Sequence, residues 1–282
     1  MKNLSKTFRY VNANGDGLVF EYAHGYLINK PTGIDTVQVA LSSAKGINQV
    51  GGTVQSATVQ ARPVTISGRI VGEDAEARKA ALMAVVRPDI PGKLYADDYF
   101  LDVYVTATPT IEPKKKMAHF QFSVTAAYPY WQKADRVTKT LWGVEKLFKF
   151  PWNISRPYQF GQLTENLFLN ILNTGQMPVP FTVAFKAVDT VKNPKITNII
   201  TGEFLLLNAT LEPGETIEVE NTHGRTYVTS SVHGDIRGAL DLDTTLFRLG
   251  VGDNTLKPDA EDGLSQLDVQ ITFAPEMSGV IL

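Results

Sequence analysis

The chain contains no cysteine. Disulfide scaffolds, thiolate zinc sites, iron–sulfur clusters and cysteine nucleophiles are therefore excluded as explanations of its function. The sequence also lacks an apolar run that approaches the length of a membrane span, and its first residues lack the apolar core of a signal peptide. We expect the protein to be made in a cytoplasm and not to be exported through a signal peptide.

An excess of charge of one sign is also missing. The 27 basic and 29 acidic residues give a formal net charge of -2, so electrostatics favour neither nucleic acid nor an anionic membrane as partner. The single basic run, Lys114–Lys116, is typical of a solvated turn. With 282 residues, 43% of them hydrophobic and 20% charged, the chain reads as an ordinary globular protein of one large or two medium domains.

Motifs for catalysis are lacking as well. No glycine-rich phosphate motif opens a helix, and no nucleophile elbow or Ser/His/Asp order stands out. His223 and His233 each lie beside a glycine in a turn, without a helix to arrange them as metal ligands. Residues 12–16 resemble the start of a calcium loop, but its twelfth position is Ala23 rather than a bidentate glutamate. We therefore expect no enzyme activity, no metal and no cofactor.

One segment predicts a convincing α-helix, at about residues 73–87. Asp74 is placed to cap its first amides, Arg78 lies four residues later for an ion pair, and Pro88 ends the helical pattern. A lone amphipathic helix must lay its apolar face on a sheet. The residues on that face are Ala75, Ala81, Leu82, Val85 and Val86.

Alternating segments around this helix predict strands, and together they indicate an antiparallel β domain with one helix over residues 1–132. The predicted strands are 7–11, 18–22, 34–41, 64–70, 99–108 and 117–127. We interpret the Ser/Gly-rich segment Ser42–Gly52 and the turn 109–116 as polar loops. Because long loops within compact domains are usually functional or disordered, we expect both to contact neighbouring subunits or partner proteins. The candidate contact residues are Ser42, Lys45, Asn48, Lys114 and Lys115.

An aromatic-rich junction follows over residues 133–165. The three tryptophans of the chain, Trp131, Trp142 and Trp152, lie in it or next to it. Large rings can bury a domain junction while their polar edges stay hydrated, and we interpret the three tryptophans in this way. The alternative is a sugar-binding platform, because aromatic faces stack on pyranose rings.

Residues 166–282 contain no credible helix. Short strands recur between turn signals, which predicts a β-sandwich. Glu212–Glu215 carries proline and glycine at its two central positions, the pattern of a type II turn. The predicted strands are 167–172, 181–188, 203–209, 216–220, 225–230, 246–249 and 267–273.

With both halves considered, the chain resembles the distal tail proteins of long-tailed bacteriophages, the family of siphophage tail components. No single motif carries this resemblance, whereas the order and spacing of several motifs do. They are Leu82–Pro88, Gly92–Tyr95, Tyr128–Trp131, Asn173–Gly175 with Pro178 and Pro180, Leu211–Glu215, Phe247–Asn254 and Val269–Phe273.

The resemblance implies a mainly β, non-enzymatic structural protein of the virion. In this family the first domain forms a ring, usually a hexamer, between the tail tube and the tip, and the second is a galectin-like sandwich that points outward. The implied partners are further copies of the chain, the tail tube protein and tail-associated or tail fibre proteins. The alternative function is a carbohydrate-binding module for host cell-surface glycans, although the strands between Phe181 and Phe273 leave no room for the inserted sugar-binding module of some members.

Overall fold

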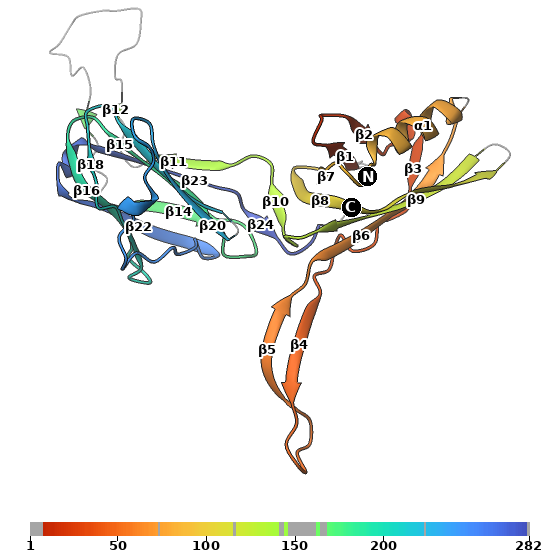
Figure 1. The fold of residues 1–282 in the computed structure, drawn as a ribbon, viewed down its shortest axis with the longest axis horizontal. Coiled ribbons are helices and arrows are strands. Elements are labelled where there is room, and N and C mark those ends of the chain that lie inside the picture. The colour runs from red at the N-terminus through yellow and green to blue at the C-terminus, as the bar shows by residue number, and fades with distance from the viewer. Residues whose placement is uncertain are drawn as a thin grey trace, which may run out of the picture. The chain divides into compact units, whose positions relative to one another are not determined.

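The structure is a computed structural model that forms two compact units, Met1–Asp135 with Glu276–Leu282 and Arg136–Pro275 (Figure 1). The residues described are 8–72, 74–114, 117–140, 144–145, 162–163, 168–222 and 224–280, with the backbone alone for 113–114, 144–145 and 162–163. The last residues of the chain thus belong with the first unit, a return that no sequence pattern indicated.

The first unit is built on an antiparallel sheet in the order β2-β1-β7-β8-β9-β6-β3, with β10 beside β8 and β24 beside β10. The strands are β1 (Phe8–Asn12), β2 (Gly17–Val19), β3 (Tyr26–Ile28), β6 (Arg62–Ile70), β7 (Gly92–Ala96), β8 (Tyr99–Lys114), β9 (Met117–Ala126), β10 (Trp131–Lys133) and β24 (Glu276–Met277). Alternation explains their pairing: Val64, Ile66 and Ile70 of β6 are fully buried, whereas Thr65 and Arg69 face outward. The predicted strand at 64–70 is confirmed.

Helix α1 (Ala75–Val85) lies on this sheet and packs against β2, β6 and β8 (Figure 1). Leu82 and Val86 are buried in the core that they share with the strands, so the predicted apolar face is confirmed. The predicted cap at Asp74 is wrong, because its side chain makes no capping hydrogen bond. The carboxylate lies instead 3.7 Å from the Arg78 guanidinium, in the predicted ion pair.

Between β3 and β6 the chain forms a separate two-stranded ribbon, β4 (Val39–Ala44) and β5 (Thr53–Val59). The predicted loop Ser42–Gly52 is therefore partly wrong, because Ser42–Ala44 are in β4 and only the tip is a turn. The predicted strand at 34–41 starts five residues too early, because β4 begins at Val39. Both errors have the same cause: serine, alanine and threonine dominate the ribbon and produce no visible apolar alternation.

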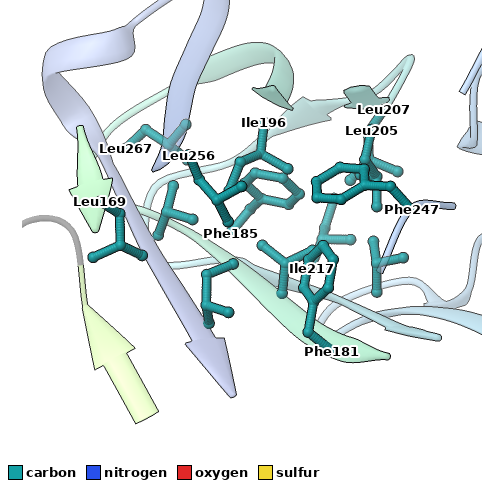
Figure 2. Close-up of a cluster of buried hydrophobic side chains, with 14 of the residues drawn as sticks. Leu169, Phe181, Phe185, Ile196, Leu205, Leu207, Ile217, Phe247, Leu256 and Leu267 are labelled. Atoms are coloured by element: carbon teal, nitrogen blue, oxygen red, sulfur yellow. The ribbon is translucent and has the colours of Figure 1, made fainter. Parts of the chain in front are cut away.

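The second unit is a two-sheet sandwich, as predicted. One sheet has the order β11-β23-β15-β19-β20-β21, and the other β14-β22-β16-β17 with β18 beside β16. Figure 2 shows Phe185, Ile196 and Ile217 among the apolar side chains of the shared core. The strands are β11 (Val137–Thr140), β14 (Leu169–Asn173), β15 (Phe181–Ala187), β16 (Val191–Asn198), β17 (Phe204–Leu206), β18 (Thr210–Leu211), β19 (Thr216–Thr222), β20 (Arg225–Ser230), β21 (Gly234–Asp235), β22 (Gly252–Asp262) and β23 (Leu267–Phe273). A further short pair is β12 (Val144–Glu145) with β13 (Gln162–Leu163), and the 3₁₀ turns are η1 (Tyr22–His24), η2 (Arg237–Ala239) and η3 (Leu264–Gln266).

Two long strands of this sandwich, β16 and β22, were not predicted, because prolines and charged residues mask their alternation. Pro194 lies inside β16 rather than at a strand start. Its carbonyl accepts a hydrogen bond from the Leu207 amide, so its missing N–H faces the same side, between β17 and β18. The predicted strand 246–249 is wrong, because in this segment only Leu249 forms a bridge, with Val179.

The predicted turn Glu212–Glu215 is confirmed, with Gly214 at φ 83° and the Glu215 amide 3.0 Å from the Glu212 carbonyl oxygen. It also buries the Glu215 carboxylate, which accepts from the Ser230 hydroxyl at 2.5 Å and from the Glu212 amide at 2.9 Å.

Glu215→Ala should therefore destabilise the second unit by about 2–3 kcal/mol, because the buried Ser230 hydroxyl and the part-buried Glu212 amide lose their acceptor. Urea unfolding followed by circular dichroism measures this change. Glu212→Ala, at the exposed start of the same turn, is the matched control and should change stability by less than about 0.5 kcal/mol. Equal effects from both variants would contradict the burial argument.

Candidate assembly site

The ribbon β4–β5 and its tip are the most exposed part of the described chain. We call residues 39–59 the arm. From Gln38 to Ala61 every residue except Gln49 is exposed. Lys45 is the single charged residue within the arm. An exposed two-stranded ribbon is marginally stable by itself, and its open edges invite pairing with other chains. The arm therefore has the properties of a surface that another molecule covers.

Cross-strand pairing sorts the arm side chains onto two different faces. Val39 pairs with Val59 and Leu41 pairs with Ala57, and paired residues share a face. A bulge between Ser42 and Ser43 then brings Val54 opposite Ser43, on this same side. Four branched apolar residues consequently share the first face, whereas the second face carries alanine, serine and threonine. The exposed fractions on the apolar face are Val39 51%, Leu41 64%, Val54 56% and Val59 40%.

Three of the five predicted contact residues lie in the arm, at its tip or in β4. Ser42 lies in β4, Lys45 follows β4 directly and Asn48 adopts a left-handed backbone with φ 60°. Beside them, Ile47 and Val50 are completely exposed. These two apolar residues were not among the predicted contacts, although their position in an otherwise polar loop was visible in the sequence.

Lys114 lies away from the arm. It is the last residue of β8, in the hairpin that pairs Lys114 with Met117 beside the Ile70 end of β6. The arm joins β6 at its other end, at Arg62, so the structure does not combine the two predicted contact regions into one site. Lys115 lies outside the described residues.

Of the junction tryptophans, the structure describes Trp131 alone; Trp142 and Trp152 lie outside the described residues. Trp131 is fully buried in the core of the first unit, and its indole N–H donates to the Ile34 carbonyl at 3.0 Å. A ring in this position is not available to stack on a sugar.

The outward face of the sheet in the first unit carries a row of cations stacked on aromatic rings. The Arg9 guanidinium lies 4.1 Å from the centre of the Tyr95 ring, and the Lys93 ammonium lies 4.0 Å from that of Phe100. Lys93 also pairs with Asp102 at 2.7 Å. These contacts join β1, β7 and β8 into a rigid, mixed-charge surface suited to a protein partner.

Further along this face, a shallow cleft of about 410 Å³ opens over β6, β8 and β9. Asn29, Ser67, Glu112, His119 and Gln121 are among its lining residues. Throughout the described ranges, no group of three or more His, Asp or Glu residues is arranged to hold a metal ion. Nor is any helix in those ranges long and apolar enough to cross a membrane.

Comparison with known proteins gives one matching family and several similar structures. Residues 174–276 match the family described as siphovirus-type tail component, C-terminal domain. No curated protein matches the chain. The crystal structure of SPP1 Dit (gp 19.1), described as a paradigm of the hub adsorption apparatus in phages that infect Gram-positive bacteria, is similar with a TM-score of 0.71 at 12% identity, over 95% of this chain and 98% of that chain. A chain of the phage P2 baseplate in its activated conformation with Ca is similar with a TM-score of 0.51 at 10% identity, over 98% of this chain and 100% of that chain.

The family match defines the class of the second unit, because residues 174–276 match the C-terminal domain of siphovirus-type tail components, and the whole chain shares the fold of SPP1 Dit. Within that class, the resemblance to the distal tail proteins that the order of sequence motifs indicated is confirmed. The matched family and SPP1 Dit are described as parts of phage tails or of the adsorption apparatus, which supports the predicted location in the virion tail.

Proposed function

We propose that the protein forms a closed ring of six copies that acts as a hub between the tail tube and the host-adsorption apparatus. In this ring the first unit makes the subunit contacts, and the arm of each copy lies across the next copy. The observation that carries the proposal is the arm itself, with 21 consecutive residues, one charge and an apolar face that the described chain does not cover.

The apolar face of the arm is large enough to support such a contact. Full burial of a valine or leucine side chain stabilises by about 1.5–3 kcal/mol, and the four residues of this face have about half of their surface still to bury. Covering them contributes about 4 kcal/mol per contact, or about a thousandfold in affinity. Main-chain hydrogen bonds at the open edges of β4 and β5 add specificity.

The geometry of the contact favours a ring. An arm that lies on a surface different from the one it leaves makes a heterologous interface, and such interfaces either close by rotation or grow into filaments. The number six comes from the resemblance to distal tail proteins. The similarity to SPP1 Dit, a protein described as a hub of the adsorption apparatus, supports the hub role.

The remaining predicted contacts have places in this proposal. Ser42, Lys45 and Asn48 lie on the arm and meet the neighbouring copy. The predicted contacts Lys114 and Lys115 meet an adjacent tail protein, such as the tail tube protein or a tail-associated protein. The stacked row around Tyr95 offers a second, rigid surface for such a partner.

Light scattering coupled to size exclusion tests the ring directly. We expect a mass near six times the 31.0 kDa of one chain, with a fraction that rises with protein concentration. A species of fixed intermediate mass would overturn the number six, and a ladder of growing masses would overturn closure.

The alternative function is recognition of host glycans by the second unit. One observation favours it: Thr272, Thr182, Glu220 and Tyr227 lie in one cross-strand row on the outward face of the larger sheet. Hydroxyls, a carboxylate and a ring that is 42% exposed are the groups that bind sugars. A glycan array distinguishes the two functions, and a monomer that binds a glycan tightly would replace the ring as the primary role.

A further inference from the structure

We call residues 33–35, where the chain leaves the sheet, the root of the arm. One backbone carbonyl group in the root accepts three hydrogen bonds. The oxygen of Ile34 accepts from the Arg62 guanidinium at 2.8 Å, from the Trp131 indole at 3.0 Å and from the Val280 amide at 3.1 Å. The donors come from β6, from β10 and from the last residues of the chain. Three segments that are distant in sequence therefore meet where the chain leaves the sheet for the arm.

Arg62 is the centre of this arrangement and is only 2% exposed. Besides Ile34, its guanidinium donates to the Gly33 carbonyl at 3.1 Å and to the Ser278 carbonyl. Burial lowers the pKa of Arg62 to about 10, while Asp35 acts in the opposite direction. The guanidinium is therefore still charged at neutral pH, and its hydrogen bonds to the carbonyls are of the stronger, charge-assisted kind.

The C-terminal segment closes over the same root. A Cβ atom at Gly279 would lie 2.4 Å from the Asp35 carbonyl oxygen, so only glycine permits this close approach. Just before it, Met277 pairs with Trp131 in the sheet. On the sheet side, Gly33 has φ 85°, and a Cβ atom there would lie 2.1 Å from the Pro63 carbonyl oxygen. Backbone thus packs on backbone on both sides of residues 33–35.

We infer that Ser278–Val280 is a latch that fixes the direction in which the arm leaves the sheet, with Arg62 and Trp131 as positioning residues. The inference rests on the proposed function, in which the arm contacts the next copy. Because the arm is exposed along its length, its orientation depends on its root. Seven residues of strand span about 23 Å, so a tilt of about 20° at the root moves the tip by about 8 Å.

A fixed root makes the arm a pre-organised ligand for the next copy. An arm that swings freely must be ordered when the ring assembles, and that ordering costs affinity. We therefore expect a loosened latch to weaken assembly at least tenfold, although it removes no residue of the arm.

The absence of cysteine makes the latch measurable. Asn48→Cys at the tip and Gln121→Cys on the exposed face of β9 place two spin labels in an otherwise cysteine-free chain. Electron–electron double resonance on the labelled protein, at a dilution where light scattering shows monomers alone, reports the distance within one copy. We expect a narrow distance distribution in the parent.

Two variants loosen the latch in different ways. Gly279→Ala forces the segment away from Asp35, and a chain that ends at Met277 lacks the segment but retains β24. Both should broaden the distance distribution and weaken ring formation at least tenfold. Gly238→Ala is the matched control, because a Cβ atom there meets nothing within 4 Å, and it should change neither measurement.

The outcomes separate this inference from the proposed function. A distribution as narrow as that of the parent in both variants would overturn the latch, whatever happens to assembly. Unfolding of the first unit in both variants would overturn it too, because the segment would then belong to the core of the fold. A broadened distribution with unchanged assembly would support the latch and contradict the role of the arm in the ring.

Discussion

A chain in which residues 39–59 are replaced by Asn-Gly should fold like the parent and remain monomeric where the parent forms rings. The Gln60 amide already lies 2.8 Å from the Gln38 carbonyl oxygen, so a two-residue turn can join these positions without strain. Since the removed residues contribute exposed surface and not core, thermal unfolding of the first unit should not change. Light scattering and differential scanning calorimetry measure the two effects.

A single substitution on the arm provides the graded version of this experiment. Leu41→Ser should weaken each contact about tenfold, because it removes about 1.4 kcal/mol of apolar burial. Leu172→Ser is the matched control: this leucine in the second unit is 54% exposed, compared with 64% for Leu41, and the change should leave assembly unaltered. Rings that form normally from the arm-deleted chain would refute the arm contact altogether.

Leu82→Asp should abolish cooperative folding of the first unit while leaving the second unit folded. Leu82 is fully buried beneath α1, and an unpaired carboxylate there costs about 4 kcal/mol or more, a large fraction of the stability of a small unit. Denaturant unfolding should then show one transition in place of two.

Met83→Asp is the control for this variant. Met83 is the next residue of the same helix and is 59% exposed, so its replacement should change stability by about 0.5 kcal/mol or less. If Leu82→Asp left the transition of the first unit in place, α1 would not be the support of the sheet.

The elements predicted correctly are those in which local chemistry and burial agree. The stripe around Leu82 has the period of a helix that lies on a sheet, and Val64–Ile70 alternates because one face is buried. Pro213 and Gly214 specify their turn by backbone preference alone. In β16 and β22, by contrast, lysines and aspartates occupy the outward positions, the buried Pro194 and Pro258 interrupt the usual apolar residues of the inward ones, and pairing with distant strands determines the structure.

The candidate site was predicted in part for the same reason. The length and polarity of Ser42–Gly52 predicted a contact region, but small side chains concealed that it is half of a ribbon. The near absence of charged residues in the arm was a sequence signal that could have identified it as a contact surface. The root was beyond sequence reasoning, because Arg62 and Ser278 are 216 residues apart and only the fold brings them together.

Amide hydrogen exchange across residues 39–59 tests the central claim most directly. The exposed arm should exchange rapidly in the dilute monomer, and its amides should become protected by at least about tenfold at concentrations where light scattering shows the ring. The backbone amides of β6, β8 and β9 at the polar cleft provide an internal reference in the same spectra, against which the protection of the arm amides is compared. Rapid exchange of the arm in the assembled ring would contradict the claim that a neighbouring copy covers it.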